Sequence, residues 1–160
     1  MKKLFFLALA VIVLASCQPK ANTKSSPADF KIFKGTNIAH WLSQSGRRGA
    51  ERDSFFQEKD VAYIKSQGFD HIRLPIDEEQ MWDENGVRHD EAFALMTNCL
   101  DWCKKHDLKV IVDLHILRSH HFNAKEKPLW TDPKEQEKFY RFWQDLSAAL
   151  HLYPVSDVAY

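Results

Sequence analysis

Two short β-rich runs of the chain end in polar side chains whose types could do chemistry. The run at residues 71–75 contains Arg73, and the run at residues 110–115 contains Asp113 and His115. In a parallel sheet covered by helices the strands are apolar on both faces, so ionisable groups near their carboxyl ends are expected where they line a site. Side chains alternate between the faces of a strand, which puts Asp113 and His115 on one face. The sequence therefore predicts that Arg73, Asp113 and His115 converge at one rim of the sheet.

The elements that must position these groups alternate between strands and helices. Periodicity predicts strands at residues 30–37, 71–76 and 109–115, a fourth that begins at 158–160, and helices at about 53–68, 91–106 and 133–150. Asp53 is a possible cap of the first helix, Gly68 ends it, and Asp132 followed by proline marks the start of the third helix. After the second strand, the turn signal Asn85-Gly86 predicts a small hairpin over the mouth of the sheet.

This order of elements predicts right-handed crossovers and a parallel sheet. A closed (β/α)8 barrel usually needs about 250 residues, whereas residues 30–160 supply three strand–helix units and the beginning of a fourth. We therefore expect an α/β fold that is the amino-terminal half of a (β/α)8 TIM barrel, truncated near the start of strand four. A complete flavodoxin-like domain is the alternative, although the loop after Asn37 does not clearly supply the phosphate-binding turn that is usual there.

The first residues of the chain predict that the protein is located in the cell envelope. A cationic start at residues 1–3 precedes an apolar run at 4–15 that is too short to span a bilayer, which is typical of a secretory signal. The run closes in Leu-Ala-Ser-Cys, which resembles the lipobox of bacterial lipoproteins and implies cleavage before Cys17 and lipidation of its thiol. An ordinary cleaved signal with an incidental cysteine is the alternative. Gln18 resembles the sorting pattern for the outer membrane, so we expect a lipid-anchored protein of the outer membrane or cell surface.

We accordingly divide the chain into a lipoprotein signal peptide at residues 1–16, a flexible tether at 17–29 and an incomplete barrel at 30–160. The charge is balanced, with 22 lysines and arginines against 22 acids, so no nucleic-acid partner is expected. Cys99 and Cys103 lie on an apolar helical stripe and are interpreted as small buried hydrophobes rather than a metal pair or a disulfide. Asp113, His115 and the later histidines do not have the spacing of a standard zinc motif, so no metal and no cofactor are expected.

Five motifs in order resemble one known family. They are Lys34-Gly35-Thr36-Asn37-Ile38-x-x-Trp41, then Gly68-Phe69-Asp70-His71-Ile72-Arg73-Leu74-Pro75, Asp83-Glu84-Asn85-Gly86, Leu100-Asp101-Trp102-Cys103 and Val112-Asp113-Leu114-His115. Together they look like the amino-terminal half of glycoside hydrolase family 5, the cellulase family. The resemblance implies retaining cleavage of β-linked glucans or mannans by two glutamates, whose carboxyl groups lie about 5–5.5 Å apart in retaining enzymes. It also places both glutamates beyond Tyr160, so the fragment as written is predicted to be inactive.

The resemblance implies roles for the residues at the rim. Arg73 corresponds to the family arginine that holds the nucleophilic carboxylate, and His115 to the histidine that contacts the sugar near the cleavage point. Asn37 ends the first strand beside them, and Asp113 is expected to orient its neighbours by hydrogen bonding. The alternatives are a surface ion pair for Arg73 and a satisfied core histidine for His115.

Further residues are candidates for sugar binding. Sugar rings present apolar C–H faces that stack on aromatic rings, which makes the loop tryptophans Trp41, Trp82 and Trp130 possible platforms, although each could instead be a packing residue. Trp102 and Trp143, on predicted helices, are expected to pack. The polar loop after the third strand adds the remaining candidates, His120, His121 and Asn123.

Two functions fit these features. The first is a surface-anchored glycoside hydrolase fragment of endo-β-1,4-glucanase or cellulase type, with a β-glucan or related polysaccharide as partner and a membrane contact through the lipid on Cys17. The alternative is a lipoprotein that binds polysaccharide without cleaving it.

Overall fold

The computed structural model describes residue 26 and residues 29–160. The predicted signal peptide at 1–16, the lipidation site at Cys17 and nearly all of the tether at 17–29 lie outside the described residues. Within the described part of the chain, no helix combines the length and apolarity needed to cross a membrane.

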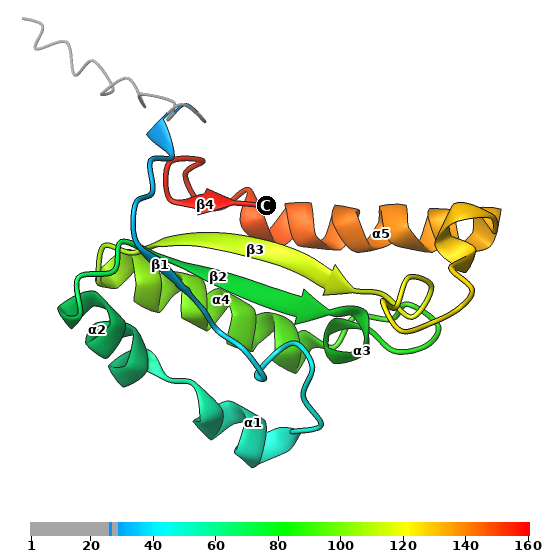
Figure 1. Cartoon of the computed structure of the whole chain (residues 1–160), viewed down its shortest axis with the longest axis horizontal. Coiled ribbons are helices and arrows are strands. Elements are labelled where there is room, and N and C mark those ends of the chain that lie inside the picture. The colour runs from blue at the N-terminus through cyan, green and yellow to red at the C-terminus, as the bar shows by residue number, and fades with distance from the viewer. Residues whose placement is uncertain (1–25, 27–28) are drawn as a thin grey trace, which may run out of the picture.

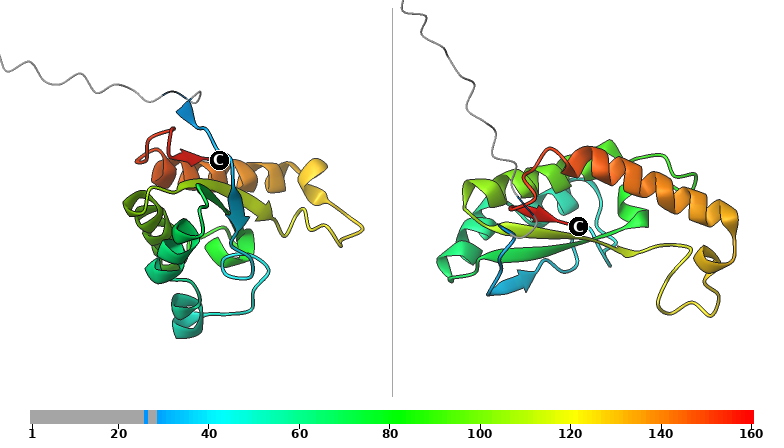
Figure 2. Two further views of the ribbon diagram at one scale, coloured as in Figure 1. Left: turned by 60° about the vertical axis from the view of Figure 1, so that its left-hand side comes forward. Right: turned by 90° about the horizontal axis from the view of Figure 1, so that it is seen from above.

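Four parallel strands form one sheet whose order follows the chain (Figure 1). They are β1 (Gly35–Asn37), β2 (His71–Asp77), β3 (Lys109–Ile116) and β4 (Val158–Ala159). The predicted parallel α/β order is confirmed, including a fourth strand that begins at Val158. Figure 2 shows the sheet as one twisted layer with α4 (Asp90–Lys105) and α5 (Pro133–Leu150) running along it.

The first strand is shorter than the predicted 30–37. The Asp70 carboxylate accepts the backbone N–H groups of Phe33 and Lys34 at 2.7 and 3.1 Å, so this part of the chain is fastened to a side chain rather than to a neighbouring strand. The His71 side chain explains why β1 begins with a glycine. A Cβ on Gly35 would lie 2.1 Å from Nε2 of the His71 ring, so any other residue there would force this ring to move.

The prediction of a single helix at about 53–68 is wrong. The chain instead forms α1 (Gly49–Phe55) and α2 (Glu58–Ser66), and Asp53 lies inside α1 rather than at its cap. A reciprocal capping box between Gln57 and Asp60 starts a new helix. Phe56, extended between the two helices, places its ring 5.1 Å from that of Trp41.

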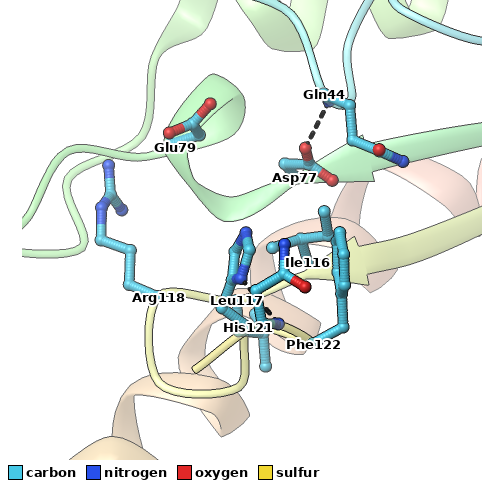
Figure 3. A pocket seen from close by; sticks show the side chains of 9 residues that line it. Gln44, Asp77, Glu79, Ile116, Leu117, Arg118, His121 and Phe122 are labelled. Carbon is cyan, nitrogen blue, oxygen red and sulfur yellow. Dashed lines mark hydrogen bonds between the residues drawn. The ribbon is translucent and has the colours of Figure 1, made fainter. Parts of the chain in front are cut away.

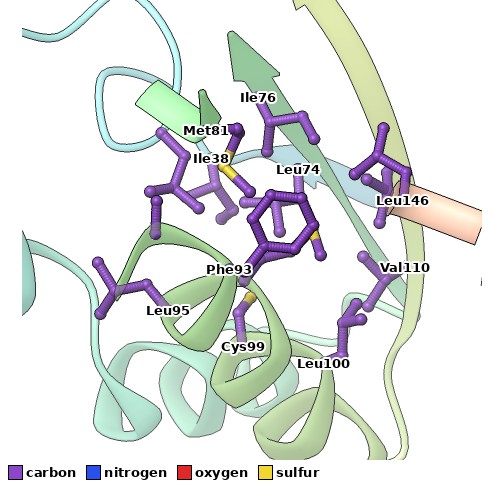
Figure 4. Close-up of a cluster of buried hydrophobic side chains, with 14 of the residues drawn as sticks. Ile38, Leu74, Ile76, Met81, Phe93, Leu95, Cys99, Leu100, Val110 and Leu146 are labelled. Carbon is purple, nitrogen blue, oxygen red and sulfur yellow. The ribbon is translucent and has the colours of Figure 1, made fainter. Parts of the chain in front are cut away.

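The core lies between the sheet and its helices (Figure 4). Alternate residues of β2 and β3 are buried there, and the stripe of α4 predicted from the sequence fills the space opposite them, namely Phe93, Met96, Cys99, Leu100 and Cys103. Both cysteines are buried and free, as predicted. The Cys103 thiol and burial together raise the pKa of the Cys99 thiol, so both act as apolar packing groups.

The segment after β2 contains the short helix α3 (Glu78–Met81) and then the predicted small hairpin, closed by an antiparallel bridge between Trp82 and Arg88. Its predicted place over the mouth of the sheet stays a prediction. The Trp82 ring turns into the core, where it stacks on Phe142 of α5 and meets Phe93 of α4 edge-on. The hairpin therefore packs against two helices, and its Trp82 and Asp83 carbonyls also accept hydrogen bonds from the Arg118 side chain.

The last helix starts and ends where the sequence predicts. The Asp132 side chain caps α5 by accepting the Lys134 N–H at 2.9 Å, and Pro133 takes the first helical position. The 3₁₀ turn η2 (Pro128–Trp130) leads into this cap.

Candidate active site

Arg73 connects three strands at the polar rim of the sheet. Its guanidinium donates to Oδ1 of Asn37 at 2.6 Å and to Oδ2 of Asp113, and it lies 3.1 Å from Nδ1 of His115. The same His115 nitrogen lies 3.1 Å from the Asp113 carboxylate. The predicted convergence of Arg73, Asp113 and His115 is therefore confirmed, and Asn37 joins them.

Strand register explains this meeting. Asn37 of β1 pairs with Arg73 of β2, which pairs with Ile111 of β3. Because alternate residues of a strand share a face, Asp113 points to the same side as Ile111 and reaches back to the guanidinium. The Arg73, Asp113 and His115 side chains are each about one-third exposed, so a ligand can reach the network.

A groove adjoins this network at the carboxyl ends of β2 and β3. It consists of one cavity of about 380 Å³ lined by His115, Gln44 and His120, and another of about 290 Å³ lined by Asp77 and Arg118 among others (Figure 3). Gln44, Ile116 and Phe122 line both cavities, so the two form one continuous depression that begins at His115.

Asp77 fastens the loop after β1 to the end of β2. Its Oδ2 accepts the Gln44 N–H at 2.6 Å, and its own N–H donates to the Leu42 carbonyl at 2.9 Å. The residue is almost completely buried, and burial raises the pKa of its carboxyl group above the ordinary aspartate value. The loop that it holds contains two non-glycine residues with left-handed backbone, His40 and Gln44.

A second buried acid fixes the wall of the groove. The Glu78 carboxylate is fully buried and accepts the side chain of Arg118 at 2.9 Å and its backbone N–H at 2.8 Å. The Lys138 ammonium of α5 lies 3.1 Å from the same carboxylate. These contacts fasten the start of the loop after β3 to both α3 and α5.

Two of the three tryptophans expected as sugar platforms, Trp41 and Trp82, require correction. Trp41 and Trp82 are completely buried, and their indole N–H groups donate to the Arg52 carbonyl and to the Asp145 carboxylate at 2.8 Å each. They are core residues, because both rings are large enough to fill the space between helices. Trp130 is 67% exposed and lines a separate cavity with Phe139 of α5, so its contact with sugar stays a prediction.

The polar residues predicted to bind sugar line different cavities of the groove. His121 and Asn123 line the cavity that contains Asp77, whereas His120 lines the cavity that contains His115. His120 also meets the Trp130 ring edge-on at 5.4 Å. Their substrate contacts stay a prediction. Among residues 29–160, no group of three or more histidine, cysteine, aspartate or glutamate side chains is arranged to hold a metal ion.

Sequence reasoning missed seven residues that line the groove, namely Gln44, Asp77, Glu79, Ile116, Leu117, Arg118 and Phe122. Asp77 carried a usable signal, because it is a polar residue at the end of a strand, as Asp113 and His115 are. Gln44 and Phe122 lie in loops without periodicity, where nothing in the sequence indicates the direction of a side chain.

Comparisons with known proteins decide the family. The family model described as cellulase (glycosyl hydrolase family 5) matches residues 28–155, and the model of the prokaryotic membrane lipoprotein lipid attachment site matches residues 1–18. The chain belongs to glycoside hydrolase family 5. It is 31% identical over 118 residues to cellodextrinase A of Ruminococcus flavefaciens, covering 72% of this chain and 35% of that protein. It is 34% identical over 117 residues to endoglucanase C of Acetivibrio thermocellus, covering 71% of this chain and 34% of that protein.

Solved structures agree on the fold of this family 5 chain. A broad-specificity endoglucanase from an uncultured bacterium matches with a TM-score of 0.66 at 15% identity, over 84% of this chain and 40% of the other. A family 5 enzyme from Prevotella bryantii B14, solved with a xyloglucan tetradecasaccharide, matches with a TM-score of 0.61 at 19% identity, over 81% and 40%. The chain thus forms a partial barrel and spans about a third of the length of the curated relatives it matches.

Proposed function

We propose that this chain is the amino-terminal part of a lipid-anchored, retaining glycoside hydrolase that cleaves a β-linked polysaccharide of the β-1,4-glucan type. The observation that carries the proposal is the network of Arg73, Asn37, Asp113 and His115 at the rim of a family 5 partial barrel. The relatives named cellodextrinase and endoglucanase support a glucan as the substrate class.

Within this proposal, the chain supplies supporting groups and the catalytic glutamates follow Tyr160. Arg73 holds the nucleophilic carboxylate, since a guanidinium binds a carboxylate through paired charge-assisted hydrogen bonds. Asn37 and Asp113 fix the guanidinium in place, and His115 contacts the sugar beside the cleavage point. Because hydrolysis with retention needs an acid/base and a nucleophile, residues 1–160 alone are expected to be inactive.

The proposed arrangement along the chain has three parts. Residues 1–16 are a signal peptide that is removed, residues 17–29 are a tether that starts at the lipidated Cys17, and residues 30–160 belong to the barrel. The match to a lipoprotein attachment site supports the anchor. Gln18 after the lipidated cysteine favours the outer membrane or cell surface, where long polysaccharides are accessible.

The experiment is expression of the complete reading frame that contains this chain, without residues 1–16, followed by measurement of reducing sugar released from carboxymethylcellulose, mannan and xyloglucan. Release from a β-1,4-glucan, with no release by residues 30–160 alone, is the expected result. The shorter protein matching the rate of the complete one would contradict the proposed place of the glutamates.

The second candidate is a lipoprotein that binds polysaccharide without chemistry. The open groove beside His115 is the observation that favours it, because the groove is present in residues 29–160 whether or not glutamates follow. Retention in glucan-containing gels without any release of reducing sugar by the complete protein would decide for this candidate.

A further inference from the structure

Two side chains line both cavities of the groove and have no role in the proposed chemistry. One of them is polar and the other is aromatic. Gln44 is an exposed amide from the loop after β1, and Phe122 is an exposed phenyl ring from the loop after β3. They come from segments far apart in the chain and lie on opposite walls of the same depression (Figure 3).

Gln44 is held in an unfavourable backbone conformation. Its φ is 50°, in the left-handed region, and such residues persist only where the surroundings over-determine them. Asp77 supplies that constraint through the 2.6 Å hydrogen bond to the Gln44 N–H, and Nδ1 of His40 lies 3.1 Å from the Gln44 carbonyl oxygen. The main chain is therefore fixed while the side-chain amide stays exposed in the groove.

Phe122 presents the complementary surface. Its ring is 61% exposed and stacks on the imidazole of His121, with the centroids 4.7 Å apart and the planes at 18°. The stacking orients one face of the phenyl ring. Exposed rings that line a groove are typical of ligand-binding sites.

A pyranose ring matches this pair of surfaces. Its hydroxyl groups donate and accept hydrogen bonds, as a glutamine amide does, and its C–H faces are apolar, as a phenyl ring is. We propose that Gln44 and Phe122 form a subsite for one pyranose ring of a β-linked glycan, next to the ring that His115 contacts. Asp77 is the positioning residue that keeps Gln44 in the groove. This inference rests on the proposed function and deepens it.

The test uses affinity electrophoresis of the complete protein in native gels that contain hydroxyethylcellulose or xyloglucan. Gln44→Gly removes the amide and leaves a residue that accepts the left-handed backbone, and Phe122→Ala removes the ring. The matched controls are Gln144→Ala on the exposed face of α5 and Phe33→Ala, whose ring is 96% exposed. Each groove variant is expected to raise the dissociation constant about 5- to 10-fold, while the controls stay within about twofold.

Hydrolysis kinetics give a second readout. A subsite that holds its sugar equally in the ground state and the transition state changes KM and not kcat. Both groove variants are therefore expected to raise KM on the polysaccharide and to leave kcat unchanged. If the wild-type protein hydrolyses glucan and both variants bind and react as it does, the subsite is refuted and the proposed function stands. If the wild-type protein neither binds nor hydrolyses any of the glycans, both fail.

The role of Asp77 has its own test. Asp77→Ala removes the acceptor for the Gln44 N–H, whereas Asp77→Asn keeps one oxygen that can accept it. Asp77→Ala is expected to weaken binding as much as Gln44→Gly does, to add nothing in the double variant, and to be largely rescued by Asp77→Asn. Equal weakening by Asp77→Ala in the wild-type and Gln44→Gly backgrounds would refute the positioning role, with circular dichroism confirming that each variant is folded.

Discussion

Arg73 is the side chain on which the rim of the sheet depends, because it joins residues of three strands. It contacts Asn37 of β1 and both Asp113 and His115 of β3. A lysine at this position could not reproduce the contacts, since one ammonium group lacks the planar fork that reaches two acceptors in fixed directions.

Replacement of Arg73 tests its role directly. Arg73→Ala and Arg73→Lys are both expected to lower kcat/KM of the complete protein by roughly 10²–10³, the usual loss when one preorganised hydrogen-bond donor is removed from an active site. The matched control is Arg141→Ala on the exposed face of α5. Retained secondary structure with lost activity is the expected result, and full activity of Arg73→Ala would remove the arginine from the proposed site.

The raised pKa of Asp77 predicts a pH dependence of stability. Below the ordinary aspartate pKa of about 3.9, the group is protonated in both the folded and the unfolded protein. As the pH rises from there through the raised pKa, the folded protein gives up the proton less readily, so the free energy of unfolding falls. Burial is the main cause of the raised pKa. The hydrogen bond from the Gln44 N–H opposes it more strongly than the nearby His115 does, and Glu79 adds to it.

Asp77→Asn should remove this dependence. The stability of the variant relative to wild type is expected to improve steadily from about pH 4 towards neutral pH, as measured by urea midpoints at several pH values. A constant difference between Asp77→Asn and wild type across the range would contradict the prediction.

For single residues, the sequence was sufficient to predict the position of side chains whose direction is set by a strand. Arg73, Asp113 and His115 follow the alternation of two strands, so their meeting could be derived from residue order alone. Trp41 and Trp82 could not be placed, because residue type does not show whether a ring near a turn points inward or outward. The walls of the groove depend on loops, whose side-chain directions are set by distant contacts such as that between Asp77 and Gln44.

Among the elements, the hairpin after α3 is the one that ties two helices together. Trp82 stacks on Phe142 of α5 with the ring centroids 4.3 Å apart, meets Phe93 of α4 at 5.4 Å, and donates to Asp145. The packing of α4 beside α5 therefore depends on a residue that belongs to neither helix.

Two tryptophan variants compare the contribution of a buried ring to stability with that of an exposed ring. Trp82→Ala is expected to lower the free energy of unfolding by about 3–5 kcal/mol, because it leaves a large cavity and an unpaired Asp145 carboxylate. Trp130→Ala should change it by less than about 0.5 kcal/mol, as exposed substitutions usually do. Urea unfolding of the complete protein measures both, and similar losses for the two variants would contradict the burial described here.

Elements with strong periodicity and clear ends were predictable. The bounds of β2, β3, α4 and α5 lie within one residue of those expected, since apolar stripes and the Asp132 cap define them. The break between α1 and α2 was not predictable, because the apolar residues continue across it. Only the pairing of Gln57 with Asp60 shows where the second helix starts. The length of β1 also escaped prediction, since the Asp70 side chain takes over the backbone donors of Phe33 and Lys34.

For the molecule as a whole, the side of α5 and β4 that faces away from α4 is rich in exposed aromatic rings. Tyr140 and Tyr160 are both more than half exposed, and the Trp143 ring stacks on that of Tyr160 with the centroids 6.1 Å apart. Exposed apolar surface of this kind is normally covered by further structure or by association.

This surface predicts different behaviour for the two lengths of protein. Residues 30–160 alone are expected to enhance the fluorescence of 8-anilinonaphthalene-1-sulfonate and to self-associate, and Tyr140→Glu should reduce both effects. The complete protein should show neither. Sedimentation velocity and dye titration measure these properties, and a monomeric, dye-silent short protein would contradict the expectation.

The Arg73 network also has a consequence for the order in which the proposed enzyme folds. Its hydrogen bonds join residues only 36 to 42 positions apart, and the entropy of closing such loops grows slowly with their length. If the protein is exported as proposed, a polypeptide that emerges amino-terminus first can therefore assemble this scaffold before the proposed nucleophile has left the translocation channel. The late-arriving glutamate would meet a guanidinium already oriented to receive it.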